Sequence, residues 1–151
     1  MLCFSFRFAR PLRKRQGFRF DLLALRGVLS KVVLGRRDIR AMRREAILKL
    51  IEERSAESGL SAATVAALLG ITPRYVHRLL GETGKSFTHH VLERRLDKAA
   101  ALLHDPRWRH RKIADVAAEA GFTDLSHFNR AFRRRFGATP SDIREQAKHR
   151  G

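Results

Sequence analysis

The chain has 151 residues, 44% of them hydrophobic, and carries a formal net charge of +17 with a pI of about 11.6. This length fits one domain plus an extension, and this charge favours a polyanionic partner, nucleic acid first and an anionic membrane surface second. The single cysteine, Cys3, excludes an intrachain disulfide and a zinc site built on several cysteines, and it is compatible with a reducing cytoplasm. No apolar run approaches the roughly 20 residues that cross a bilayer, so no transmembrane helix is expected.

The first 40 residues are far more basic than the rest of the chain. They hold 11 Lys and Arg against two acids, whereas residues 41–151 hold 21 against 13. Residues 1–20 are rich in Arg and Phe and lack acids, a composition shared by DNA-contacting arms, mitochondrial targeting peptides and disordered tails. Residues 21–35 predict a short apolar helix that ends near Gly35 and packs on the rest of the chain or on a partner.

From Ile39 onward, apolar residues recur with the 3.6-residue period of an amphipathic helix. The stripe consists of Ile39, Met42, Ala46, Ile47, Leu50 and Ile51. It predicts a helix that ends near Ser58–Gly59. A short second helix follows, because Ser61 is a suitable N-cap and Gly70 a suitable end.

A third helix is predicted to begin at Thr72–Pro73, where the hydroxyl caps the helix and proline fits the first helical position. Its buried face is expected to carry Tyr75, Val76, Leu79 and Leu80. Gly81 and Gly84 end this helix. Ser86 then caps a long helix over about 87–103, whose apolar stripe consists of Val91, Leu92, Leu96, Ala99, Ala100 and Leu103.

The chain after Asp105–Pro106 contains three more predicted helices. The first carries Ile113, Val116, Ala117 and Ala120 and stops at Gly121. Thr123 or Asp124 caps the second, which carries Phe128, Ala131, Phe132 and Phe136. Thr139–Pro140 begins a last short helix through Ile143 and Arg144. No segment shows the alternation of a strand, so we predict an all-α fold.

An internal repeat with an offset of 51 residues relates the two pairs of short helices. Val65–Ala66 matches Val116–Ala117, and Gly70–Thr72 matches Gly121–Thr123. Each copy is a short helix, a glycine-containing turn and a second helix, which is the helix-turn-helix layout. The glycines supply turns that favour positive φ, and the small alanines let the two helices cross closely.

This repeat predicts the domain organisation. Residues 1–40 are expected to form a basic extension, and residues 41–147 a homeodomain-like DNA-binding domain with two helix-turn-helix subdomains. The first subdomain covers about 60–82 and the second about 111–136, joined by a long central helix over about 86–104. That helix spans roughly 26 Å, whereas major grooves on one face of DNA recur every ~34 Å. We therefore expect one copy to bind an asymmetric site, with bent DNA if the reading helices lie closer than one turn.

The outer faces of the second helices carry the candidate DNA contacts, because Arg pairs with guanine, Asn with adenine, and apolar side chains with the thymine methyl. The candidate base contacts are Arg74, His77 and Arg78 in the first copy and Leu125, Ser126, His127, Asn129 and Arg130 in the second. The candidate phosphate contacts are Ser61, Arg111, Lys112, Arg133 and Arg134, and Arg135 continues the last cluster. The competing interpretation is ordinary solvated charge on a helical bundle, which two motifs in register in so basic a chain disfavour.

These residues resemble the C-terminal signature of the AraC/XylS family of transcription regulators. The resemblance rests on Gly121–Phe132, Phe136–Pro140, Arg144, Arg95–Leu96, Thr72–Pro73, Tyr75–Val76 and Arg78–Leu79. It covers about residues 42–146 and implies a seven-helix DNA-binding domain with two helix-turn-helix units, usually in a transcriptional activator. It also implies double-stranded DNA and RNA polymerase as partners, and a location with the nucleoid in a bacterial cytoplasm. Leu80 stands where the family usually has Phe, which predicts looser packing of the first unit.

Most members of the family carry a separate effector-binding or dimerisation domain ahead of the DNA-binding part. Here about 40 residues without strand alternation precede it. The chain is then a stand-alone regulator controlled by its abundance, a fragment whose sensor was lost, or a sequence with a misassigned start, and we favour the fragment. In each case we expect no small-molecule ligand in this chain.

Other function classes have less support in the sequence. The seven histidines show no metal-ligand spacing with acids or Cys, and we predict no catalytic residue, no metal and no cofactor. A DNA-repair methyltransferase with a similar DNA-binding part would need a reactive or zinc-bound cysteine besides Cys3. The alternatives that remain are a basic protein that binds DNA of any sequence and a protein held at an anionic membrane surface by residues 1–37.

Overall fold

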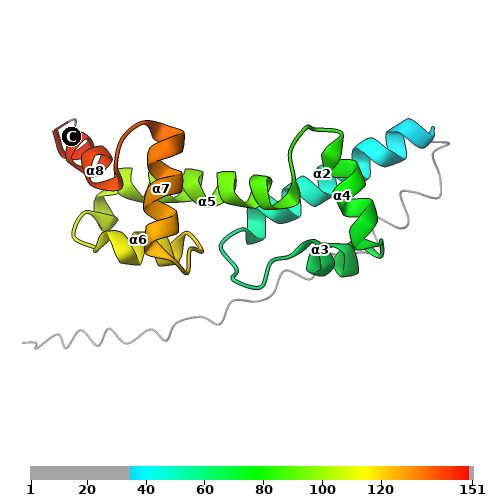
Figure 1. Cartoon of the computed structure of the whole chain (residues 1–151), viewed down its shortest axis with the longest axis horizontal. Coiled ribbons are helices and arrows are strands. Elements are labelled where there is room, and N and C mark those ends of the chain that lie inside the picture. Colours follow the sequence, from blue (N-terminus) through cyan, green and yellow to red (C-terminus); the bar gives the residue numbers. More distant parts are fainter. Residues whose placement is uncertain (1–34, 150–151) are drawn as a thin grey trace, which may run out of the picture. The chain divides into compact units, whose positions relative to one another are not determined.

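The computed structural model describes residues 35–149, and every regular element in this part of the chain is helical (Figure 1). The elements are α2 (Arg36–Arg54), α3 (Ala62–Leu69), α4 (Pro73–Gly81), α5 (Phe87–His104), a 3-10 turn (Pro106–Trp108), α6 (Ile113–Glu119), α7 (Leu125–Phe136) and α8 (Pro140–His149). The prediction of an all-α fold is confirmed. The predicted basic arm over 1–20 and, except for Gly35, the predicted helix over 21–35 lie outside the described residues.

Helix starts agree with the predicted caps. Ser61, Thr72 and Ser86 each accept a hydrogen bond from the backbone N–H three residues later, at 3.1 to 3.2 Å. At the start of α7, where two residues were possible, Asp124 is the cap, and its Oδ1 accepts the N–H of His127 at 2.8 Å. Each bond satisfies a donor that the first helical turn leaves unpaired, which stabilises a helix by about 1 kcal/mol.

Two predicted helix ends are wrong, and one helix begins before its apolar stripe. α2 begins at Arg36, three residues before the apolar stripe, because the Asp38 carboxylate accepts the Gly35 N–H at 3.1 Å. It ends at Arg54 instead of near Ser58–Gly59. Arg95 of α5 donates to the carbonyls of Ser55 and Glu57 beyond that end, a contact that the periodicity of α2 cannot predict. The last helix, α8, continues to His149, well past the predicted end at Arg144.

Two hydrophobic cores lie along α5, and each belongs to one helix-turn-helix unit. The first joins α5 to α2, α3 and α4 through Ile47, Ile51, Val65, Ala66, Val76, Leu79, Leu80, Phe87 and Val91. The second joins α5 to α6, α7 and the turn between them through Leu96, Ala99, Leu103, Val116, Ala117, Ala120, Phe122, Phe128, Ala131 and Phe132. This division confirms that a central helix joins two helix-turn-helix subdomains.

Four phenylalanines hold α7 in the second core. Adjacent rings of Phe122, Phe128, Phe132 and Phe136 lie 4.9, 5.4 and 4.6 Å apart between centroids, in tilted arrangements. Phe128 and Phe132 are fully buried, and burying such a side chain contributes about 1.5 to 3 kcal/mol. Leu80, where the family pattern has Phe, is likewise fully buried in the first core.

Candidate nucleic-acid interface

The second helix of the first unit, α4, turns a polar face outward because its opposite face is buried in the core. Arg74, His77 and Arg78 are all exposed, as the period of the helix predicts. Tyr75 lies at the edge of this face and is half-buried. Its ring centre lies 4.8 Å from the guanidinium carbon of Arg78, so Arg78 stacks on the surface of its own helix.

The second helix of the second unit, α7, exposes all five of its candidate base contacts. Leu125, the first residue of α7, is 43% exposed. Among the described residues, it is the large apolar side chain that remains exposed to solvent. The ring of His127 lies 6.0 Å from that of Phe122, at the edge of the second core. Asn129 and Arg130 follow one turn later and are exposed. This face therefore offers an apolar contact, an amide and a guanidinium, which suit different base edges.

Three candidate phosphate contacts lie where the first helices of the two units begin, whereas Arg133 and Arg134 are exposed in the last turn of α7. Ser61 precedes α3, and Lys112 precedes α6. The backbone N–H of Lys112 donates to the Asp115 carboxylate at 3.1 Å, and the Lys112 side chain is exposed. The guanidinium of Arg111 lies 6.0 Å from the ring centre of Trp108. Helix N-termini favour phosphate, because their unpaired N–H groups and dipole carry partial positive charge.

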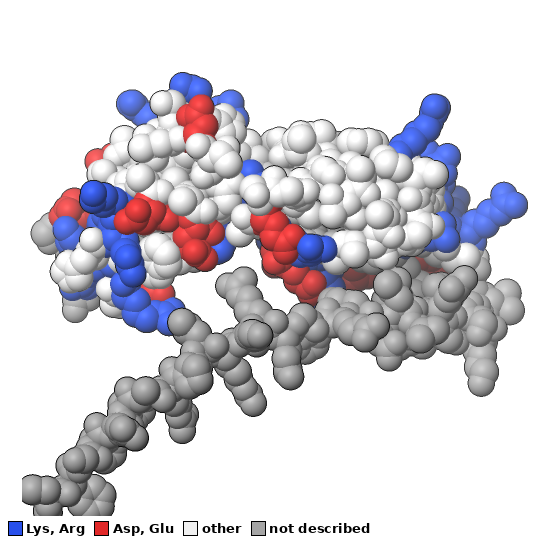
Figure 2. All heavy atoms as spheres, turned by 90° about the horizontal axis from the view of Figure 1, so that it is seen from below, with Lys and Arg blue, Asp and Glu red and all other residues white. Residues whose placement is uncertain are grey.

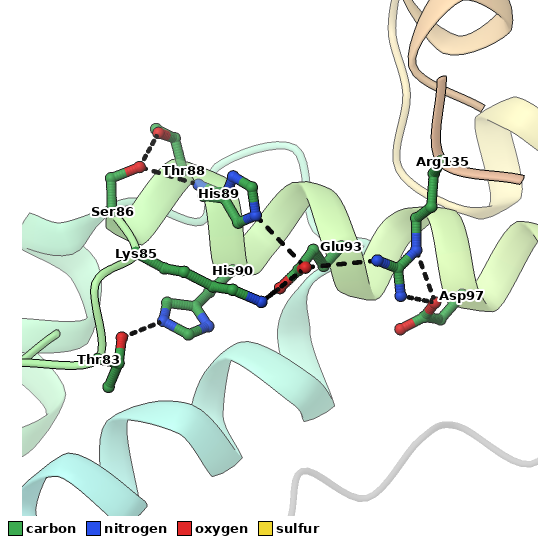
Figure 3. A network of polar contacts seen from close by, with 9 residues as sticks. All are labelled: Thr83, Lys85, Ser86, Thr88, His89, His90, Glu93, Asp97 and Arg135. Carbon is green, nitrogen blue, oxygen red and sulfur yellow. Dashed lines mark hydrogen bonds and ion pairs between the residues drawn. The ribbon is translucent and has the colours of Figure 1, made fainter. Parts of the chain in front are cut away.

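Arg135 does not belong to the cluster that the sequence suggested. It lies three residues after Phe132 and four after Ala131, so it falls on the side of α7 that faces α5, although its side chain remains exposed. There it binds Asp97 at 2.8 Å and Glu93 at 3.3 Å (Figure 3). The helical period of α7 contained this signal, which the run of three arginines obscured.

The ion pairs divide the basic residues into two groups. In the part of the chain that the structure describes, acidic side chains pair with Arg40, Arg44, Arg54, Lys85, Arg94, Lys98, Arg107, Arg135 and Lys148. None of these ion pairs involves the basic candidate contacts Arg74, Arg78, Arg111, Lys112, Arg130, Arg133 and Arg134. The face seen in Figure 2 also shows Lys and Arg at both ends of the described part, with several Asp and Glu between them. Among residues 35–149, the basic candidate contacts are thus held in no direct ion pair, although Arg130 lies near Asp124 and Arg133 near Asp142.

A metal-ligand cluster and a membrane-spanning helix are both absent from the described residues. Among residues 35–149, no three His, Cys, Asp or Glu side chains gather as metal ligands would. No helix in that range has both the length and the apolar character needed to cross a bilayer.

Comparison with known proteins places this chain among transcription regulators. A family described as "Helix-turn-helix domain" matches residues 65–146. The chain is 38% identical over 97 residues to the "Transcriptional activator RhrA" of Rhizobium meliloti. The aligned segment covers 64% of this chain and 31% of that protein. It is 30% identical over 105 residues to the "XylDLEGF operon transcriptional activator" of Pseudomonas putida, covering 69% and 32%. The chain thus spans about a third of the length of these relatives.

Solved structures of transcription regulators are also similar to this chain. An AraC-type transcriptional regulator from Chromobacterium violaceum is 27% identical, with a TM-score of 0.64 over 74% of this chain and 96% of that one. A DNA-binding transcriptional dual regulator from Escherichia coli K-12 is 25% identical, with a TM-score of 0.62 over 69% and 96%.

Proposed function

The chain belongs to the AraC/XylS family of helix-turn-helix transcription regulators, and from this premise we propose that it binds a specific promoter site and activates transcription there. The observation that carries the proposal is the division of charge: Arg74 and Arg78 on α4 and Arg130 on α7 are exposed, and none of the ion pairs found among residues 35–149 includes them. Exposed arginines that are not held in ion pairs give these faces a positive potential, which attracts the phosphate backbone of DNA. The relatives named above are described as activators, which supports activation over repression.

In this proposal α4 and α7 each enter a major groove and read unlike base sequences. Arg74, Arg78 and Arg130 pair with guanine O6 and N7, and Asn129 pairs with adenine N6 and N7. Ser126, His77 and His127 complete the two reading faces. Because the two faces differ, one copy of the chain reads an asymmetric site of two unlike blocks, with no symmetry-related second copy required.

The remaining candidate residues set the position of the chain on the duplex. Ser61 contacts a phosphate beside the first block. Arg111 and Lys112 contact phosphates beside the second block, and Arg133 and Arg134 extend that contact along α7. These contacts carry affinity and little sequence preference. RNA polymerase is the partner expected of an activator, and the bacterial cytoplasm, at the nucleoid, is the expected location.

Selection from a library of genomic DNA fragments by the purified chain, at about 150 mM salt, tests the function. One enriched asymmetric motif, with two unlike blocks about a helical turn apart, is the expected result. Binding of every duplex with similar affinity, fading steeply as salt rises, would instead indicate a sequence-independent DNA-binding protein.

Single substitutions then test the residue assignment. Arg130→Ala should cost about 1 to 3 kcal/mol on the selected site and relax the preference at one base position. Lys112→Ala should weaken binding equally on specific and random DNA. Arg94→Ala is the matched control, because Arg94 is exposed on α5 and already pairs with Glu52 at 3.7 Å. Equal losses on both DNAs for Arg130→Ala would rule out its base-reading role.

A further inference from the structure

We propose that Arg43 of α2, which stacks on the ring of Tyr75, binds a DNA phosphate beside the base pairs that α4 reads. The inference rests on the proposed function and extends the interface to a helix outside both helix-turn-helix units. Residue 43 also lies outside the range 65–146 that matches the family.

The site is built on the ring of Tyr75. The guanidinium carbon of Arg78, one turn later on α4, lies 4.8 Å from the ring centre, and that of Arg43, from α2, lies 5.5 Å from it. Both arginines are exposed. Each contact is a cation–π interaction, which orients a guanidinium without neutralising it.

Two positive charges on one ring repel each other, and in the described residues no ion pair supplies either of them with a carboxylate. A phosphate diester placed beside the ring would supply the missing charge and accept paired N–H bonds from a guanidinium. Arg43 is therefore oriented by Tyr75 and still free to bind an anion. On a DNA-reading face, the available anion is the backbone phosphate next to the groove.

The neighbouring arginines of α2 show what distinguishes Arg43. Arg40 and Arg44 both bind Glu82, the C-cap residue of α4, and the Arg44 contact measures 3.2 Å. These two ion pairs hold α2 against the end of α4, and they engage the guanidinium groups of Arg40 and Arg44 on either side of Arg43. Arg43 consequently keeps a fixed position relative to α4, and a phosphate bound there would help to set the depth and register of α4 in its groove.

The test is Arg43→Gln, which keeps most of the side chain but removes the charge. Binding is measured against salt on the selected site and on a random duplex, together with interference by ethylated phosphates. The slope of log K against log salt should fall in magnitude by about 1 on both DNAs, since one phosphate contact is lost. One phosphate flanking the first block should stop interfering when ethylated. Arg43→Lys should keep the wild-type slope, because the charge remains.

Arg94→Gln is the matched control and should leave the slope unchanged, since Glu52 already neutralises Arg94. Thermal unfolding of each variant separates a lost contact from a damaged fold. An unchanged salt slope for Arg43→Gln would overturn the inference. Failure of the wild-type chain to select any motif would overturn the proposed function instead, and the slopes on random duplex would still decide whether Arg43 binds phosphate.

Discussion

Gly121 of the second helix-turn-helix unit lies against the backbone of Ala56, in the segment that joins α2 to the first unit. A Cβ atom added to Gly121 would lie 2.7 Å from the Cα of Ala56 and 2.8 Å from its carbonyl oxygen, closer than any side chain tolerates. Two bonds accompany this contact. Arg95 of α5 donates to the carbonyl of Ser55 at 2.7 Å, and Lys98 donates to the carbonyl of Glu119 at 2.6 Å. The turn that precedes α7 is thus tied to the segment that follows α2.

The first prediction concerns this contact. Gly121 has a φ of +96°, so Gly121→Ala both strains the backbone and displaces the segment at Ala56. Gly70→Ala is the control, because Gly70 has a φ of +62° in the equivalent turn but has nothing within 4 Å of an added Cβ. We expect Gly70→Ala to lower the free energy of unfolding by about 1 to 2 kcal/mol, and Gly121→Ala to lower it by clearly more. Urea denaturation measures the free energy of unfolding of both variants. Equal decreases would show that the backbone at Ala56 moves away from the added Cβ at no cost in stability.

The second prediction concerns Leu125. An apolar side chain that is 43% exposed at the start of a reading helix gains by covering a thymine methyl group. If it does so, replacing one thymine of the second block by uracil should cost the wild-type chain about 0.8 kcal/mol, the value of one buried methyl-sized group. The same replacement should cost Leu125→Ala nothing. A uracil effect of equal size in both proteins would exclude this contact.

The third prediction concerns pH and the cluster around Glu93, which Lys85, His89 and Arg135 all contact (Figure 3). The hydrogen bond from Lys85 is the main cause that holds the pKa of the Glu93 carboxyl below its usual value. Because the folded state favours the ionised form, this stabilisation is present above the ordinary pKa and is lost as the pH falls through the lowered pKa.

Glu93→Gln should therefore lower the free energy of unfolding by about 0.5 to 1 kcal/mol at pH 7, as expected for a partly exposed cluster, and by less at pH 3. Urea denaturation at the two pH values gives the difference. Glu52→Gln is the control, since its 3.7 Å pair with Arg94 is more exposed and should contribute little at either pH. An effect of Glu93→Gln that does not depend on pH would contradict the assigned titration.

Features encoded by neighbouring residues were predictable from the sequence. Ser61 and Thr72 cap their helices through groups three residues away, and Gly70 adopts the positive φ that its turn requires. The inward and outward faces of α4 and α7 follow from the helical period alone. The repeat then gave the order of the units, because each copy carries its own cap, turn and apolar face.

Features that depend on distant residues were not predictable in this way. The end of α2 is bound by Arg95, which lies 40 residues later in the sequence. The pairing of Arg43 with Tyr75 also joins two helices whose separation in space no local pattern reveals. Arg135 is the intermediate case: its face was readable from the period of α7, but its partners Glu93 and Asp97 were not.

The last prediction concerns the spacing of the two DNA blocks. α5 contributes to both cores, and the Gly121–Ala56 contact ties the second unit to the segment after α2, which packs in the first core. α4 and α7 should therefore not adjust independently to DNA. Five base pairs inserted between the blocks turn the second block by about half a helical turn, away from α7. Affinity should then fall to that of a site with the first block alone. Ten inserted base pairs restore the facing direction but add roughly 34 Å of distance, which α5 cannot span, so affinity should stay low. Recovery at ten base pairs would mean that the two units separate on DNA, and that the contact between Gly121 and Ala56 opens when they do.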